Sequence, residues 1–108
     1  MKKLMLLSAT LLLSVATAQA CEAQKRFVLK QLKNPASALS LELKGKDVLE
    51  VKKVERSDAL CDFAVKSELI TDDGDQAECY TQVRVVRGRT VPHVIKFLNP
   101  TERTLCFL

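Results

Sequence analysis

Hydrophobic and polar residues alternate along most of the chain after Ser37, as in strands of a sheet with one buried face. The two longest rows of alternate apolar positions run from Cys61 to Leu69 and from Ala77 to Val85. Residues 72–75, which read Asp-Asp-Gly-Asp, lie between these rows and predict the turn of a hairpin. Shorter alternating stretches predict three further strands, over residues 39–44, 49–56 and 91–97, with turns near Gly45 and Gly88.

The segment from Glu22 to Lys33 has a helical pattern, with basic residues around one apolar stripe. Pro35 ends this helix, because proline disfavours helical geometry in the residue before it. Pro92 cannot donate a backbone hydrogen bond, so the last strand is expected at a sheet edge or to start near that residue. The predicted fold class is α+β, with one N-terminal helix packed on a five-stranded antiparallel meander sheet. The residues of the helical stripe are Ala23, Phe27, Val28 and Leu32.

The first twenty residues have the pattern of a secretory signal peptide. Lys2 and Lys3 precede an apolar run from Leu4 to Ala16. The first and third positions before a cleavage after Ala20 are small residues, Ala20 and Ala18. A membrane-spanning helix needs about 20 apolar residues, whereas this run has 13 and includes hydroxyl side chains. The sequence therefore predicts a signal peptide over residues 1–20 and an exported domain over residues 21–108. The expected location is the bacterial periplasm, with secretion as the alternative, and membrane contact is expected only through the signal peptide before its cleavage.

The remaining chain has the length of one small domain. Removing 20 of the 108 residues leaves 88, and the loss of Lys2 and Lys3 leaves 15 basic against 13 acidic residues, a net charge of +2. This balance does not favour a nucleic-acid partner. A chain of this length buries only about 60–65% of its unfolded surface, so disulfides at about 3–4 kcal/mol each would supply much of its net stability.

Four cysteines predict two disulfides, because an even set in an exported domain is typical of a cross-linked fold. Bacterial lipoproteins also begin with a cysteine after processing, so a lipid anchor on Cys21 is an alternative. Lipoprotein processing sites have a larger aliphatic residue three positions before that cysteine, whereas this chain has Ala18 there and Gln19 next. A lipid on Cys21 would also leave one thiol unpaired. The cysteines are Cys21, Cys61, Cys79 and Cys106.

The hairpin register limits which cysteines can pair. If both apolar rows face inward, Cys61 lies opposite Val85 and Cys79 lies six residues away along the ladder. Six residues of strand span about 20 Å, which exceeds the limit of about 7 Å between the Cα atoms of a disulfide. A bond between Cys61 and Cys79 is therefore excluded.

Two connectivities remain, namely 21–61 with 79–106, or 21–79 with 61–106. The same register continued into the last strand puts Cys79 beside Phe97. A reversal of the tail at residues 99–100 would bring Cys106 back to that end of the sheet. The pairing 21–61 with 79–106 is therefore favoured.

No motif in the sequence identifies a reaction, a metal or a cofactor. The cysteines are 40, 18 and 27 residues apart and include no close pair of the kind that binds zinc. The acids of residues 72–75 lack the alternate spacing of a calcium loop. The single histidine, His93, has no neighbouring nucleophile motif and is expected to be a hydrogen-bonded residue of the core or its rim. We expect no metal, no cofactor and no enzymatic activity.

Positive charge is concentrated near the predicted turn at Gly88, and it suits an acidic partner, a phosphate-bearing glycolipid or an anionic surface. The favoured interpretation is that this charge keeps a sheet edge from aggregating. The leading hypothesis is a non-catalytic protein-binding, inhibitor or accessory module of the cell envelope, whose partner is an envelope or extracellular protein. The alternative is a small hydrolytic or lipid-handling enzyme with a site assembled from distant residues. The candidate binding residues are Arg84, Arg87, Arg89 and Lys96.

Overall fold

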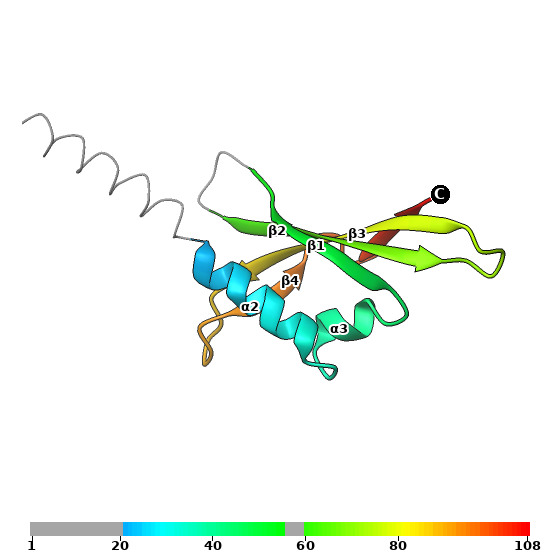
Figure 1. The fold of residues 1–108 in the computed structure, drawn as a ribbon. Helices are drawn as coiled ribbons and strands as arrows, with labels where there is room; N and C mark the ends of the chain where they lie inside the picture. The colour runs from blue at the N-terminus through cyan, green and yellow to red at the C-terminus, as the bar shows by residue number, and fades with distance from the viewer. Residues whose placement is uncertain (1–20, 56–59) are drawn as a thin grey trace, which may run out of the picture.

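The protein has an α+β fold in which two short helices lie on one face of a five-stranded antiparallel sheet (Figure 1). The computed structural model describes residues 21–55 and 60–108. The predicted signal peptide and the end of the strand expected over residues 49–56 fall outside these residues. The elements are α2 (Glu22–Lys33), α3 (Ala38–Glu42), β1 (Asp47–Lys53), β2 (Cys61–Ile70), β3 (Gln76–Val86), β4 (Val94–Phe97) and β5 (Thr104–Phe107).

The central hairpin of β2 and β3 has the predicted register. Cys61 pairs with Val85 and Ser67 pairs with Cys79 across the antiparallel ladder. The turn between the strands needs Gly74, whose φ of 86° lies in the region that favours glycine. The inward rows of both strands are buried except for the half-buried Leu69 near the turn. The alternating pattern therefore identified both the strands and the face that packs on the helices.

Residues 39–44 do not form the predicted strand, because α3 occupies this segment. Leucines at alternate positions also satisfy the four-residue spacing of a helix, so Leu39 and Leu43 are buried while Leu41 is exposed. The Ser37 hydroxyl accepts a hydrogen bond from the Ser40 backbone N–H at 3.1 Å and so caps the first turn. A serine cap two residues after Pro35 was the sequence signal for this second helix.

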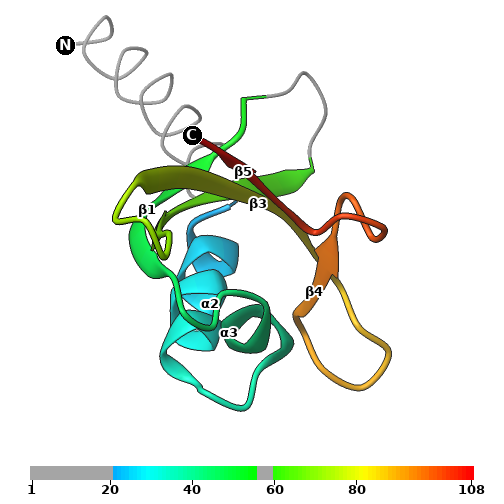
Figure 2. The same cartoon turned by 90° about the vertical axis from the view of Figure 1, so that its right-hand side faces the viewer.

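The end of the sheet also differs from the predicted meander. β4 begins at Val94, close after Pro92 as expected, but Val83 rather than Cys79 lies opposite Phe97. The chain does not reverse after β4, and β5 pairs further along the same edge of β3. Figure 2 shows β4 and β5 along this edge of the curved sheet. The sequence prediction missed β5 because it treated the residues after 98 as a returning tail.

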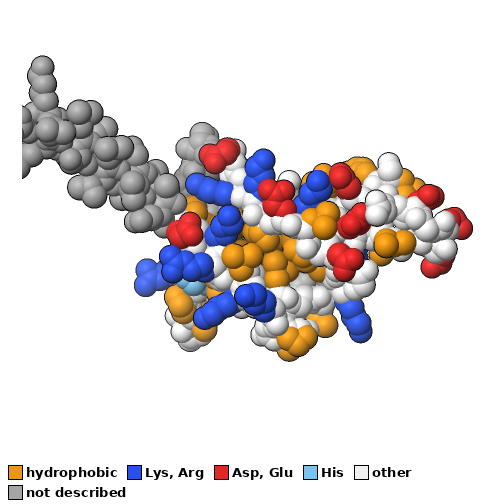
Figure 3. Space-filling view, viewed as in Figure 1, with side chains coloured by type: hydrophobic (Ala, Val, Ile, Leu, Met, Phe, Trp, Pro, Cys, Tyr) orange, Lys and Arg blue, Asp and Glu red, His pale blue; other side chains and the backbone are white. Residues whose placement is uncertain are grey.

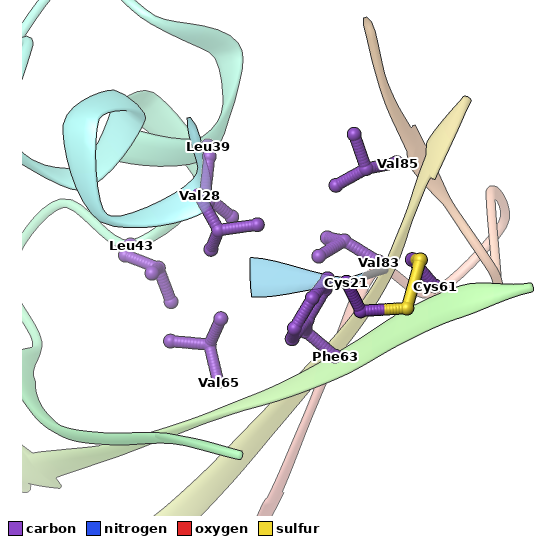
Figure 4. Packing of buried hydrophobic residues seen from close by; sticks show 9 residues of the cluster. All are labelled: Cys21, Val28, Leu39, Leu43, Cys61, Phe63, Val65, Val83 and Val85. Atoms are coloured by element: carbon purple, nitrogen blue, oxygen red, sulfur yellow. A yellow bond between two sulfur atoms is a disulfide. The ribbon is translucent and has the colours of Figure 1, made fainter. Parts of the chain in front are cut away.

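A single apolar cluster fills the space between the helices and the sheet. Figure 4 shows Val28 of α2 and Leu39 of α3 directed towards residues of β2 and β3. The side chains of Val28 and Phe63 are fully buried at the centre of this cluster. None of the helices within residues 21–55 and 60–108 has the length and apolar character needed to cross a membrane. The cluster consists of Cys21, Val28, Leu39, Leu43, Cys61, Phe63, Val65, Val83 and Val85.

Both disulfides have the favoured connectivity. Cys21 bonds to Cys61 with their Cα atoms 5.5 Å apart, and Cys79 bonds to Cys106 with theirs 4.0 Å apart. The Cys21 sulfur is therefore in a disulfide and is not available as a lipid anchor in this structure. Two disulfides are consistent with an oxidising, extracellular environment.

A hydrogen-bonded chain of side chains also holds β5. The Thr104 hydroxyl donates to Glu42 Oε1 of α3 at 3.1 Å. Because its proton is used there, it accepts a hydrogen bond from the buried Thr81 hydroxyl at 2.7 Å. This chain links β3, β5 and α3, so the C-terminal strand is attached to both layers of the fold.

Replacing Cys21 and Cys61 together by alanine is expected to lower the free energy of unfolding more than replacing Cys79 and Cys106. Either bond closes a long loop and should contribute about 3–4 kcal/mol. Cys21 and Cys61 are 6% and 8% exposed and both belong to the core cluster, whereas Cys79 is buried outside that cluster and Cys106 lies on the surface. Urea unfolding of the two double variants measures the difference. Equal losses, or a larger loss for the second pair, would contradict this ranking.

On the opposite face of the sheet, the pKa of Glu78 is lowered, mainly by the hydrogen bond from Tyr80 and then by Lys66. The contribution of Glu78 to stability is therefore present above the ordinary pKa of glutamate and is lost as pH falls through the lowered value. Tyr80→Phe is expected to raise the pKa of Glu78, as measured by NMR titration of its carboxyl carbon. A pKa that stays unchanged in Tyr80→Phe would show that this hydrogen bond is absent in solution.

Candidate functional site

A groove of about 490 Å³ lies along the exposed side of α2. Apolar side chains of α2 form part of it, and His93, just before β4, borders it from the other side. The rings of Phe27 and His93 are in contact, with their centroids 5.3 Å apart. We call this surface the basic groove, lined by Ala23, Arg26, Phe27, Leu29, Lys30, Lys33 and His93.

Three cations of α2 line the basic groove because of helical spacing. Arg26 and Lys30 are four residues apart, and Lys33 follows three residues later, so all three lie along one side of the helix. No carboxylate is among the described residues that line the groove. Figure 3 shows Lys and Arg side chains gathered around the histidine at this end of the molecule. The groove therefore combines apolar surface with positive charge and suits a negatively charged ligand.

A second hollow of about 400 Å³ continues the basic groove towards α3. Lys33 borders both hollows, and the second also contains Lys44 and the exposed Leu41. The combination of cations and apolar side chains thus extends along the length of α2 and onto α3.

The connection between β3 and β4 supplies His93 and two further cations of the predicted patch. Arg87 and Arg89 are both exposed there. Between them, Gly88 approaches its neighbours so closely that an added Cβ would lie 2.7 Å from Val94 Cγ2 and 2.8 Å from the Val91 carbonyl oxygen. A close backbone approach of this kind requires glycine and fixes the shape of the connection.

The structure separates the other two residues of the predicted patch from the basic groove. Arg84 and Lys96 are register partners on the face of the sheet that points away from the helices. The Arg84 guanidinium donates two hydrogen bonds to the Asp62 carboxylate, at 2.7 and 3.1 Å. Asp62 is fully buried, so Arg84 compensates a buried charge. Of the four predicted residues, only Arg87 and Arg89 share a segment with the groove.

The sequence prediction did not assign Arg26, Lys30 and Lys33 to a site. Their spacing was visible, but cations around an apolar stripe are also usual on the solvated side of a surface helix. These cations differ from ordinary surface cations because the β3–β4 connection brings His93 beside them, and the two segments together form a hollow. That proximity depends on the length of the β3–β4 connection and was not contained in the local pattern.

The described residues that line the basic groove give His93 no hydroxyl, thiol or carboxylate partner for acid–base or nucleophilic chemistry. The described lining of the basic groove has no serine, threonine, cysteine or carboxylate side chain. Nucleophilic catalysis by a histidine needs such a partner within hydrogen-bond distance. His93 is half-buried at the rim of the core, and its observed contact is the ring of Phe27.

The acidic turn at residues 72–75 is a hairpin turn closed by Thr71. The Thr71 N–H donates to the Asp75 carbonyl oxygen at 2.8 Å, and the Asp75 N–H donates to the Thr71 hydroxyl at 3.1 Å. Across residues 21–55 and 60–108, no group of three acidic, cysteine or histidine side chains is arranged to hold a metal ion. No family model, curated protein or solved structure matches the chain.

Arg84→Gln is expected to lower the free energy of unfolding by about 3–5 kcal/mol, because it removes the charge that compensates buried Asp62. Arg89→Gln is the matched control, since Arg89 is exposed and its replacement should change stability by no more than about 0.5 kcal/mol. Urea unfolding of both variants tests this difference. Equal effects would show that Arg84, like Arg89, is a dispensable surface charge.

Proposed function

We propose that the protein is a non-catalytic binding module of an oxidising, extracellular compartment that recognises a negatively charged partner. The observation that carries this proposal is the basic groove, in which Arg26, Lys30 and Lys33 surround apolar side chains. Apolar contact supplies affinity in such a groove, and the cations select and orient the partner. The two disulfides support the assignment to an oxidising compartment.

The chemistry of the groove favours binding over catalysis. Its cations can hold an anionic group, but its described lining offers His93 neither a nucleophile nor a carboxylate. This is the reason for preferring a binding module to the alternative of a small hydrolytic or lipid-handling enzyme. An acidic segment of an envelope protein and an anionic lipid surface both carry the charge that the groove requires.

Reversing two groove charges, Arg26→Glu with Lys30→Glu, is expected to weaken binding of poly-L-glutamate about tenfold or more. The probe is a fluorescently labelled polymer, and binding is followed by anisotropy at low ionic strength, where screening is weakest. Added salt should weaken the wild-type complex for the same reason.

The control is Lys52→Glu with Lys96→Glu, which changes net charge equally at two exposed lysines on the face of the sheet away from the helices. This variant should bind within about twofold of the wild type. Equal weakening by both variants would mean that only net charge matters, and the basic groove would not be a site. Circular dichroism confirms that both variants are folded.

A further inference from the structure

We infer that the negatively charged partner is a bilayer surface containing anionic phospholipid, on which the molecule lies with its α2–α3 side down. This inference rests on the proposed function, because it names the partner of the same groove. Three features carry it, namely projecting apolar residues, a broad basic surface and the separation of the acidic end of the molecule.

Apolar side chains project on the side of the molecule that carries the basic groove. Leu29 of α2, Leu41 of α3 and Val91 of the β3–β4 connection are 41%, 60% and 50% exposed. In Figures 1 and 2, which differ by a rotation about the vertical axis, the β3–β4 connection and the α2–α3 connection both project downwards. Both connections therefore extend towards one common plane.

Basic residues are distributed over these same segments. Figure 3 shows blue side chains above and between the lower orange patches. Each lysine or arginine near an anionic lipid surface adds to the attraction, and apolar side chains inserted between headgroups add to it independently. The basic residues of α2, the α3–β1 connection and the β3–β4 connection are Lys25, Arg26, Lys30, Lys33, Lys44, Lys46, Arg87 and Arg89.

The acidic turn at residues 72–75 lies at the opposite end of the molecule from the basic groove. It forms the far tip of the β2–β3 hairpin in Figure 1, and red side chains gather at that end in Figure 3. A negatively charged surface therefore attracts the α2–α3 side and repels the hairpin tip, which orients the molecule before contact.

A broad surface accounts for more of these features than a bound peptide does. A peptide along the basic groove and the second hollow would cover Leu29 and Leu41, but Val91 lines neither hollow and would stay exposed. A bilayer surface covers all the projecting segments at once. The arrangement is that of a peripheral protein whose apolar side chains enter the headgroup region while cations contact phosphate groups.

Vesicle flotation tests the inference with the exported protein, both disulfides formed and its first residue established by intact mass. The mass measurement is needed because an uncleaved apolar run before Cys21 would itself bind lipid. Vesicles of phosphatidylglycerol and phosphatidylcholine in equal amounts are compared with vesicles of phosphatidylcholine alone. Binding is expected only to the anionic vesicles and is expected to weaken as ionic strength rises.

Two matched apolar substitutions test the orientation. Leu41 and Ile70 are both 60% exposed, but Ile70 lies at the hairpin end of β2. Leu41→Ser is expected to weaken binding to anionic vesicles about tenfold, while Ile70→Ser leaves it within about twofold. The charge variant Arg26→Glu with Lys30→Glu should abolish vesicle binding, and the control Lys52→Glu with Lys96→Glu should retain it.

The possible results separate the two proposals. Binding of poly-L-glutamate without binding to anionic vesicles would overturn the membrane inference and leave an acidic protein as the partner. Failure of both probes would overturn the proposed function itself. Equal effects of Leu41→Ser and Ile70→Ser would overturn the orientation, and equal binding to both kinds of vesicle would show that charge does not direct it.

Discussion

The disulfide between Cys21 and Cys61 fixes the relation between helix and sheet on which the other features depend. It joins the residue before α2 to the first residue of β2, so the helix starts directly over the inner face of the hairpin. Val28 and Phe63 thereby belong to one buried apolar cluster between helix and sheet. The opposite side of α2 must then face outwards, and it carries the cations of the basic groove.

Charges on the two faces of the molecule have different roles. On the sheet face away from the helices, Arg84 compensates Asp62 and Lys66 contacts Glu78 at 3.4 Å. Among the described residues, the cations of the basic groove form no ion pair of this kind. The net charge of residues 21–108, which is +2, understates the positive field on the α2 side, because the acids of residues 72–75 lie at the far end of the molecule.

The sequence predicted those parts of the fold in which the spacing of apolar residues fits a strand and not a helix, or a helix and not a strand. The rows through β2 and β3 are long enough that only a strand explains them, and their register excluded a bond between Cys61 and Cys79. The pairing 21–61 with 79–106 is correct, but it was favoured from a register of the last strand and a reversal of the tail that the structure does not have. Leu39, Leu41 and Leu43 fit the spacing of a strand and also that of a helix. Only the serine cap before them distinguishes the two. β5 has four residues and follows an irregular connection, so its place on β3 depends on contacts distant in sequence.

The candidate site was predictable only in part, for related reasons. The hairpin register already placed Asp62 opposite Arg84, so their ion pair was implicit in the pattern. The strength of this ion pair was not predictable, because a position on the outer face of a strand is usually exposed, whereas Asp62 is buried. The groove beside α2 requires the β3–β4 connection to fold back towards the helix, and no local pattern indicates that.

The connectivity of the disulfides has a consequence for how the chain acquires them. The disulfides join consecutive cysteines, the first with the second and the third with the fourth. In a chain that enters an oxidising compartment N-terminus first, the second cysteine arrives while only the first is there to react with. In such a chain, an oxidase that joins thiols in order of arrival produces the native bonds directly, without a later exchange of partners.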